Sequence, residues 1–567
     1  MGVLTESSCT TSSCTTIPSA VSAQAGKWLE LGGGVEIAAP AATPRAREIL
    51  TPEALRLVSL LHRGFNGRRL ELLAARRVRQ AEWDAGAVPT YLEPSSEALT
   101  GSWRVAPIPK DLLRRRVEIT GPVNNAKMVI NMLSRNAAGD RADMAMLDFE
   151  DSMRPTWENV VDGVHNVAGA ARGTLSWTQP ETAGSTEKVY RLDPGDMAGL
   201  MVRVRGLHLV ETNLRVDGQP VSGGLFDLAL CLCHAAAPLL EAGKTPKLYV
   251  PKVEHFLEAR FWNDVFVAAQ EALGLGRGTL RATFLIETLP AAFQIEEILY
   301  ELREHAAGLN VGRWDKIFSD IKVLAHHPDR VLADRATIGL NRPWMRDYAQ
   351  RLVNVCHRRG AFALGGMAAF TPGRTPKVIA EQSAKVAQDK ALEARMGHDG
   401  CWVSHPYFIG TAISAFHHEN QLDVVDPALP ERPDLLPVAT PPHTLDGLRT
   451  NARVGIAYLK GWNDGIGCVA WDGLMEDLAT LEISRAQIWQ WLHNQIPLDS
   501  GQTVTTELVR KVFKEELERI LAEQREDLAE ADRETLEGTL ADFRRAGEQA
   551  ADVFTRPQLA PFLSELL

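Results

Sequence analysis

The feature that most constrains the fold of this chain is a series of eight short apolar runs separated by amphipathic segments. The runs are residues 117–122, 144–151, 200–206, 247–252, 281–288, 309–315, 361–370 and 401–406. Strands that alternate with helices form parallel sheets, and eight such units are typical of an α/β fold, the (β/α)8 TIM barrel. A doubly wound open sheet is the alternative, but the segment after the first run, 121–124, is not a glycine-rich phosphate turn. The sequence therefore favours the barrel.

The segments outside these runs predict additional domains. We expect an N-terminal segment and helical clasp over residues 1–105, and the barrel over 106–420 with a hairpin insertion near 170–197. A proline-rich linker over 421–445 and a C-terminal helical plug domain over 446–567 follow. The N-terminal helices carry a basic cluster that is either a polyanion site or a solvated helix face, and interleaved glutamates favour the second: Arg68, Arg69, Arg76, Arg77 and Arg79.

Composition narrows the class of protein. A net charge of -11 argues against a nucleic-acid surface, which needs a basic face. The first 25 residues are rich in Ser and Thr without a basic start or apolar core, so we expect disorder rather than a secretory signal. We find no uncharged apolar run of membrane-spanning length. Seven scattered cysteines fit a reducing compartment. We therefore expect a cytoplasmic protein, a monomer or small homo-oligomer, without nucleic-acid or membrane partners.

Two carboxylates end consecutive predicted strands. Active sites of such barrels lie at the carboxyl ends of the strands, where Glu287 and Asp315 would face one rim. Two carboxylates with open positions suit Mg²⁺, which keeps waters and substrate oxygens among its ligands. The alternative is a strand-end cap or a salt bridge to Arg205 or Arg313.

An arginine and a glycine turn belong to the same predicted rim. Arg205 would bring a fixed cation that stabilises an enolate oxygen, or it forms an ion pair with Glu150 or Asp151. Gly312 precedes Trp314 and permits a tight turn whose N–H groups can hold a small carboxylate.

The C-terminal domain offers a further carboxylate. Asp477 ends the segment Gly473-Leu474-Met475-Glu476-Asp477, where a loop becomes an amphipathic helix. An acidic residue at this position is expected simply as a helix N-cap. The other interpretation is a catalytic base brought to the barrel from the C-terminal domain.

A series of segments in the same order as in a known family resembles malate synthase of the A type. They are Val117-Glu118-Ile119-Thr120-Gly121-Pro122, Asp148-Phe149-Glu150-Asp151-Ser152, Arg203-Val204-Arg205-Gly206-Leu207-His208, Leu285-Ile286-Glu287-Thr288-Leu289-Pro290, Gly308-Leu309-Asn310-Val311-Gly312-Arg313-Trp314-Asp315, Gly365-Gly366-Met367-Ala368-Ala369, Gly397-His398-Asp399-Gly400, and Gly473-Leu474-Met475-Glu476-Asp477 with Glu482-Ile483-Ser484-Arg485. The resemblance covers residues 100 to 495 approximately. Such a series is far more specific than any one of its members.

The resemblance implies a Mg²⁺-dependent barrel with a helical clasp and a helical plug. It implies that Glu287 and Asp315 bind Mg²⁺, that Asp477 is the general base and that Arg205 is its electrostatic partner. It further implies a Claisen-type condensation of acetyl-CoA with glyoxylate and hydrolysis of malyl-CoA to (S)-malate and CoA, in the glyoxylate cycle. Backbone N–H groups near Trp314 would hold the glyoxylate carboxylate.

Two other functions compete with this hypothesis. One is a Mg²⁺-dependent acyl-CoA hydroxyacid lyase of the malyl-CoA or citramalyl-CoA type, a class that lacks the long C-terminal domain and its aspartate. The other is a non-catalytic binding protein, which would not need all four proposed groups. The chain also departs from the family at Cys401, where threonine is usual, and at Leu478 and Leu481.

Overall fold

The computed structural model describes residues 27–93, 96–181 and 186–565, and the disorder expected for the first 25 residues lies outside these ranges. All eight predicted strands form and close into one parallel barrel, which confirms the predicted fold class. In chain order they are β3 (Val117–Pro122), β4 (Met144–Asp148), β7 (Gly199–Arg203), β10 (Lys247–Val250), β11 (Arg281–Ile286), β12 (Ala306–Val311), β13 (Phe362–Ala368) and β14 (Gly400–Val403).

Several strands end earlier than their apolar runs predict. β4 ends at Asp148, β7 at Arg203 and β12 at Val311. Asp315, expected at the end of a strand, instead lies in the first turn of α10 (Arg313–Val323).

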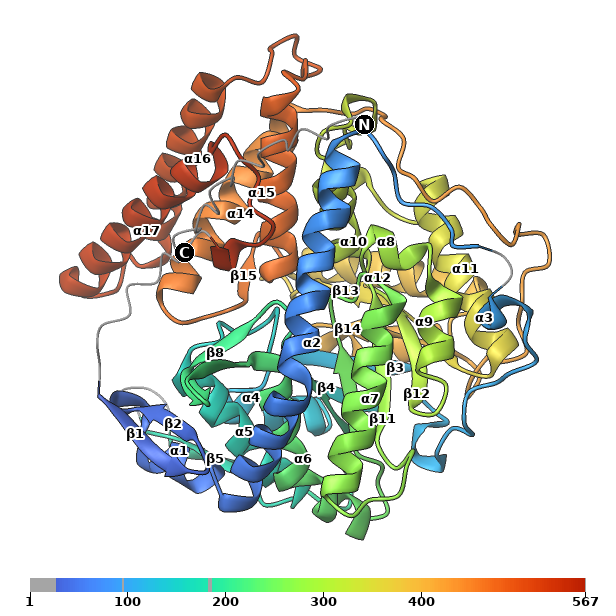
Figure 1. Ribbon diagram of the computed structural model, residues 1–567. Helices are drawn as coiled ribbons and strands as arrows, with labels where there is room; N and C mark the ends of the chain where they lie inside the picture. The colour runs from blue at the N-terminus through green and yellow to red at the C-terminus, as the bar shows by residue number, and fades with distance from the viewer. Residues whose placement is uncertain (1–26, 94–95, 182–185, 566–567) are drawn as a thin grey trace, which may run out of the picture.

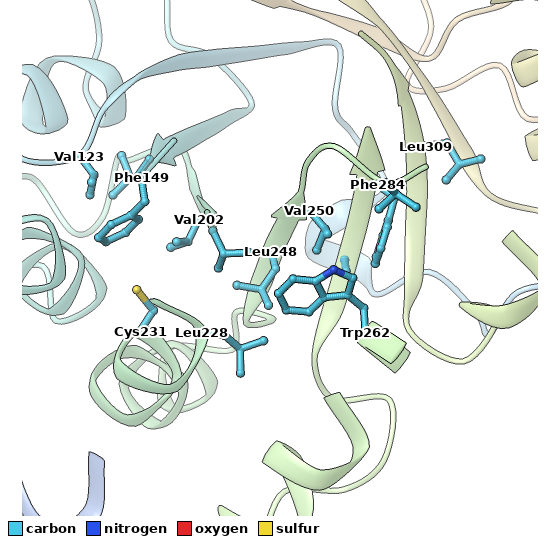
Figure 2. Close-up of a cluster of buried hydrophobic side chains, with 14 of the residues drawn as sticks. Val123, Phe149, Val202, Leu228, Cys231, Leu248, Val250, Trp262, Phe284 and Leu309 are labelled. Carbon is cyan, nitrogen blue, oxygen red and sulfur yellow. The ribbon is translucent and has the colours of Figure 1, made fainter. Parts of the chain in front are cut away.

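The main hydrophobic core lies between the outer faces of the strands and the surrounding helices. Figure 2 shows Val202, Leu248 and Val250 of the strands opposite Leu228 and Trp262 of the helices. The surrounding helices are α4 (Ala126–Leu133), α5 (Trp157–Ala171), α6 (Gly223–Glu241), α7 (Phe256–Ala272), α8 (Leu289–Ala292), α9 (Ile295–Glu301), α10, α11 (Pro343–Arg359), α12 (Pro376–Arg395) and α13 (Ile409–Ile413).

Helix α6 is a long barrel helix of mostly apolar residues. By length and composition alone it could cross a membrane, whereas the sequence predicts no apolar run of that length. Within the described residues, 72% of the tested window is buried inside the fold. Packing against α5 and against α2 (Pro52–Asp84) accounts for this composition, as expected for a core helix.

The N-terminal region combines helices with a sheet that the sequence analysis missed. Helices α1 (Pro44–Ile49) and α2 are followed by the short α3 (Glu97–Thr100), and α2 runs along α6 and α7 (Figure 1). Strands β1 (Trp28–Gly32) and β2 (Val35–Ala38) pair with β8 (Val210–Val216) and β9 (Gln219–Ser222) in a four-stranded sheet.

Two arginines of the basic cluster on α2 are buried, so the prediction that this cluster forms a solvated helix face is wrong for them. The Arg69 Nε donates to the carbonyl oxygen of Leu207 at 2.6 Å. The Arg76 guanidinium pairs with Glu258 at 2.7 Å and donates to the carbonyl oxygen of Lys252. These bonds hold α2 against the loops that follow β7 and β10.

The structure also contains an antiparallel hairpin and a long irregular segment. Strands β5 (Ser176–Gln179) and β6 (Lys188–Arg191) form the hairpin within the predicted insertion. Residues 414–444 contain turns and bends without helix or strand.

The C-terminal helices pack around a core of their own and touch the barrel. They are α14 (Leu445–Asn463), α15 (Leu478–His493), α16 (Thr506–Asp527) and α17 (Arg533–Phe554), with a ribbon of β15 (Val469–Trp471) and β16 (Leu474–Glu476) (Figure 1). Helix α15 packs against α10. The Leu478 N–H donates to the carbonyl oxygen of Asp151 at 3.1 Å, and the Met475 N–H to that of Ala369 at 2.7 Å. The start of α15 is therefore attached to the mouth of the barrel.

Candidate active site

A cavity of about 900 Å³ opens at the carboxyl ends of the barrel strands. Charged groups from both parts of the chain line it: Asp151, Arg203, Glu287, Asp315 and Asp477. A volume of this size accommodates a ligand of cofactor dimensions, because binding cavities typically range from about 300 to 1,000 Å³. The structure thus brings together Glu287, Asp315 and Asp477 as the sequence predicted.

A buried lysine lies among the carboxylates of this cavity. The Lys252 Nζ is 2.8 Å from Asp151 Oδ2 and 3.0 Å from Asp315 Oδ1. It also lies 3.6 Å from the nearest oxygens of Glu150 and Glu287. These four carboxylates outweigh the effect of burial and raise the pKa of Lys252 well above its usual range. The backbone of Lys252 is left-handed, at φ 55°, which lets its N–H donate to Glu287 Oε1 at 2.7 Å.

The surroundings of Glu287 and Asp315 fit a divalent cation. Burial raises the pKa of Glu287 and raises that of Asp315 well above its ordinary value. Glu287 Oε2 is buried without a hydrogen-bond partner among the described residues. A cation beside these oxygens would satisfy that atom and stabilise both ionised carboxylates.

The small number of carboxylates favours magnesium over a metal whose ligands all come from the protein. Within the ranges that the structure describes, no three His, Cys, Asp or Glu side chains converge closely enough to hold one ion by themselves. Mg²⁺ needs only one or two protein carboxylates, because waters and substrate oxygens complete its octahedron. Glu287 and Asp315 suit this mode of binding.

Gly312 permits the close approach of Glu287 to the start of α10. A Cβ added at Gly312 would lie 2.4 Å from the Cβ of Glu287, which is far inside van der Waals contact. The φ of Gly312 is -85°, so close packing and not a left-handed turn requires glycine here. Gly312 is the residue before α10, whose first N–H groups have no acceptor within the helix, and residues 312–315 line the cavity.

Trp314 lines the same cavity from the first turn of α10. Its Nε1 is buried and has no hydrogen-bond partner in the described part of the chain. The free N–H groups at this helix terminus can therefore bind an anionic ligand together with the indole N–H.

The structure corrects the expected position of Arg205. Its guanidinium is bound to Asp227, with Nη2 to Oδ1 at 2.8 Å, and to Glu211 at 3.1 Å. It is 1% exposed and is absent from the described lining of the cavity, where Arg203 lies instead. Neither Glu150 nor Asp151 forms the ion pair that the sequence offered as the alternative.

Arg203 is the arginine that the sequence analysis missed. Its Nε donates to Asp148 Oδ1 at 2.6 Å, and its Nη1 donates to Asp151 Oδ2 at 3.1 Å. Residues two apart lie on the same face of a strand, so the sequence predicts that the side chains of Arg203 and Arg205 point in the same direction. The strand ends at Arg203, and the turn that follows directs Arg205 towards α6. The partner Asp227 lies on α6, and no local pattern reveals that contact.

Asp477 is the helix N-cap that the sequence predicts, and it also lies at the cavity, where the proposed base would have to be. It caps α15 in a capping box with Thr480. Burial, followed by the nearby carboxylates of Asp151 and Asp315, raises its pKa well above the ordinary value. The neighbouring Glu476 is bound to Arg335 at 2.7 Å and is therefore engaged in an ion pair.

The fold and the cavity define a class of α/β-barrel enzyme whose carboxylate-rich site is completed by a second, helical domain. Three family models match the chain: the malate synthase N-terminal domain at 34–97, the TIM barrel domain at 199–429 and the C-terminal domain at 442–565.

Curated relatives agree with these matches. Malate synthase of Myxococcus xanthus is 47% identical over 84% of this chain and 87% of its own length. Malate synthase A of Escherichia coli is 43% identical over 91% of this chain and 95% of its own. The glyoxysomal malate synthase of Brassica napus is 43% identical over 85% of this chain and 86% of its own length. The chain belongs to the malate synthase family and is an enzyme of that family, a transferase.

Proposed function

We propose that this chain condenses acetyl-CoA with glyoxylate and hydrolyses the resulting malyl-CoA to (S)-malate and CoA, as a step of the glyoxylate cycle. The observation that carries the proposal is the convergence of Asp477, Arg203 and the pair Glu287 and Asp315 on one cavity. A base, a cation for a developing oxyanion and a metal-binding pair are the groups that such a reaction needs.

The first task of the site is to orient glyoxylate. The free N–H groups at the start of α10 and the Trp314 indole would bind its carboxylate. Mg²⁺ held by Glu287 and Asp315 would supply Lewis-acid activation of the aldehyde carbonyl. Gly312 allows Glu287 to lie close to the start of α10. The proposed metal site and the proposed binding site for the glyoxylate carboxylate would therefore be next to each other.

The second task is removal of a proton from the acetyl methyl group. The carboxylate of Asp477 takes this proton, and its raised pKa makes it a stronger base than an ordinary aspartate. The hydrogen bond that Asp477 Oδ1 accepts from the Thr480 N–H, at 3.2 Å, orients the carboxylate. Glu476 is a poorer candidate because Arg335 holds it.

The third task is stabilisation of the enolate oxygen. Arg203 faces the cavity with its guanidinium held by Asp148 and Asp151. A cation that is already fixed in position stabilises a developing charge without reorganising. We assign to Arg203 the electrostatic role that the family resemblance implied for Arg205.

A cytoplasmic location without nucleic-acid or membrane partners belongs to the same proposal. The net charge of -11 and the burial of α6 support it. The small-molecule partners are glyoxylate and acetyl-CoA, and the protein is a monomer or small homo-oligomer.

Product analysis tests the proposal directly. The protein is incubated with acetyl-CoA labelled with ¹³C in its methyl group, glyoxylate and Mg²⁺, and the products are followed by NMR. We expect labelled malate and CoA in equal amounts. Labelled acetate alone, or malyl-CoA that persists without hydrolysis, would contradict the proposal and would favour a thioesterase or a lyase.

A further inference from the structure

We propose that residues 556–565, which we call the C-terminal strap, hold helix α15 against the barrel and thereby position the Asp477 carboxylate. The strap follows α17 and includes a 3-10 turn at Leu563–Glu565. It has no part in the chemistry described above. The inference rests on the proposed function for its kinetic test, and a second readout does not depend on that function.

The strap joins the two hydrophobic cores of the protein. Leu559 and Phe562 pack against the core of the barrel. Leu563 is fully buried in the core formed by the C-terminal helices. Because consecutive residues insert into different cores, the strap can loosen from neither without exposing apolar surface.

On the barrel side, Phe562 is the main contact. Its ring stacks on His208 with centroids 4.0 Å apart and packs edge-on against Phe318 at 6.1 Å. The Lys322 Nζ lies 4.6 Å from the centre of the same ring. His208 belongs to the loop that follows Arg203, while Phe318 and Lys322 lie on α10. The strap therefore contacts the two barrel segments that carry Arg203 and Asp315.

On the other side, a buried ion pair of α15 binds the strap backbone. Glu482 Oε1 accepts a hydrogen bond from the Leu563 N–H at 2.5 Å, and Arg485 Nη2 donates to the Ala560 carbonyl oxygen at 2.9 Å. Glu482 and Arg485 pair with each other and are each 2% exposed. Trp489 Nε1 adds a hydrogen bond to the Pro557 carbonyl oxygen at 3.2 Å. Backbone recognition of this kind fixes the register of the strap along α15.

The strap adds to several contacts that hold α15 to the barrel: α15 packs against α10, and the Trp491 Nε1 donates to the Leu332 carbonyl oxygen at 2.9 Å. Another attachment is at the start of α15, where the Leu478 N–H donates to the Asp151 carbonyl oxygen. The strap links α15 both to α10 and, through His208, to the loop that follows Arg203. Since Asp477 caps α15, a change in orientation moves the base relative to the acetyl methyl group. A misplacement of about 1 Å can reduce a rate by about a hundredfold.

The test compares Phe562→Ala with two matched variants. Phe562→Tyr keeps the stacking ring, and Phe513→Leu weakens the C-terminal core through its contact with Phe554 while Phe562 is unchanged. We expect Phe562→Ala to lower kcat by about tenfold with the KM for glyoxylate within about twofold of the wild type. The isotope effect on kcat with deuterated acetyl-CoA should rise, because proton removal becomes more limiting. Phe562→Tyr should restore kcat, and Phe513→Leu should leave the isotope effect unchanged.

Hydrogen–deuterium exchange of the whole protein gives the second readout. In Phe562→Ala we expect faster amide exchange in residues 477–485 and unchanged exchange in α16. Unchanged exchange in residues 477–485, or a kinetic effect no larger than that of Phe513→Leu, overturns the proposal. If Phe562→Ala does not fold, Phe562→Leu, which keeps apolar volume but lacks the ring, takes its place with the same expected outcomes. Wild-type protein without condensation activity would refute the proposed function, and the exchange measurement would still decide the role of the strap.

Discussion

At the scale of single residues, the structure separates the surroundings of Arg203 from those of Arg205, and we expect only Arg203 to act in catalysis. Arg203 faces the cavity, and Arg205 is enclosed by Asp227 and Glu211. We expect Arg203→Lys to lower kcat by about a hundredfold, because lysine loses the fixed planar donors that face the enolate oxygen. Steady-state kinetics of the folded variant measures this effect.

The matched change at the neighbouring position separates the two roles. Arg205→Lys loses a bidentate pair with Asp227 and should lower the free energy of unfolding while the folded enzyme keeps its kcat. Urea unfolding and activity per folded molecule check both expectations. A large loss of kcat in Arg205→Lys together with an active Arg203→Lys would reverse the assignment.

Gly312 is a second residue whose effect can be isolated. Gly312→Ala places a Cβ 2.4 Å from the Cβ of Glu287, so the metal-binding carboxylate must move. We expect affinity for Mn²⁺, used as a spectroscopic probe for Mg²⁺, to fall by at least about tenfold, since misplaced ligands weaken metal sites by such factors. Electron paramagnetic resonance titration measures this affinity.

Gly67→Ala provides the control for that substitution. Gly67 lies on α2 with no atom near the added Cβ, and alanine is the better helix former. Unchanged Mn²⁺ affinity is expected there. Equal affinity in Gly312→Ala and the wild type would mean that Glu287 is not a ligand.

At the scale of elements, we expect the stability of the junction between α11 and the irregular segment to depend on pH. The His357 Nε2 bonds to Asp399 Oδ2 at 3.0 Å, and Nδ1 bonds to the Val424 carbonyl oxygen at 2.5 Å. Burial alone would lower the pKa of His357, but the Asp399 carboxylate and the Val424 carbonyl raise it above its ordinary value of 6.5. The folded state therefore binds the proton more tightly than the unfolded state does.

The sign of the pH dependence follows from that difference. The stabilisation that protonated His357 gives to the folded state is complete below the pKa of the unfolded state, near 6.5. It is lost as the pH rises through the higher pKa of His357 in the folded state. We expect His357→Gln to lower the free energy of unfolding by about 2 kcal/mol at acidic pH, a typical value for charged hydrogen bonds, and by less at alkaline pH. Urea unfolding of both proteins across pH 5.5 to 9 checks this. A difference that grows with pH would contradict the account.

Elements differ in how well the sequence predicts them. The eight barrel strands could be predicted because each is a short apolar run between amphipathic helices, a pattern that depends only on nearby residues. The sheet of β1, β2, β8 and β9 could not, since Val35 of β2 pairs with Val216 of β8, far away in the sequence. The position of Asp477 in the C-terminal domain was predicted, whereas the directions of Arg203 and Arg205 depend on where β7 ends.

At the scale of the whole molecule, the site exists only because the C-terminal helices are attached to the barrel. Asp477 reaches the cavity through bonds from Met475 to Ala369 and from Leu478 to Asp151. The strap adds a further attachment through Phe562 and Leu563. In the proposed function the barrel supplies Arg203 and the carboxylate pair, and the C-terminal domain supplies the base, so both parts are needed.

The most direct test of this account is CoA release from acetyl-CoA in the presence of glyoxylate and Mg²⁺, measured with a thiol reagent for the wild type and Asp477→Asn. Asparagine is as good an N-cap as aspartate, so α15 should remain intact in the variant. We expect CoA release by the wild type to require both substrates and Mg²⁺, and the variant to be slower by about a thousandfold, within the range for loss of a general base. A variant rate near that of the wild type, or no CoA release by the wild type, would contradict the account.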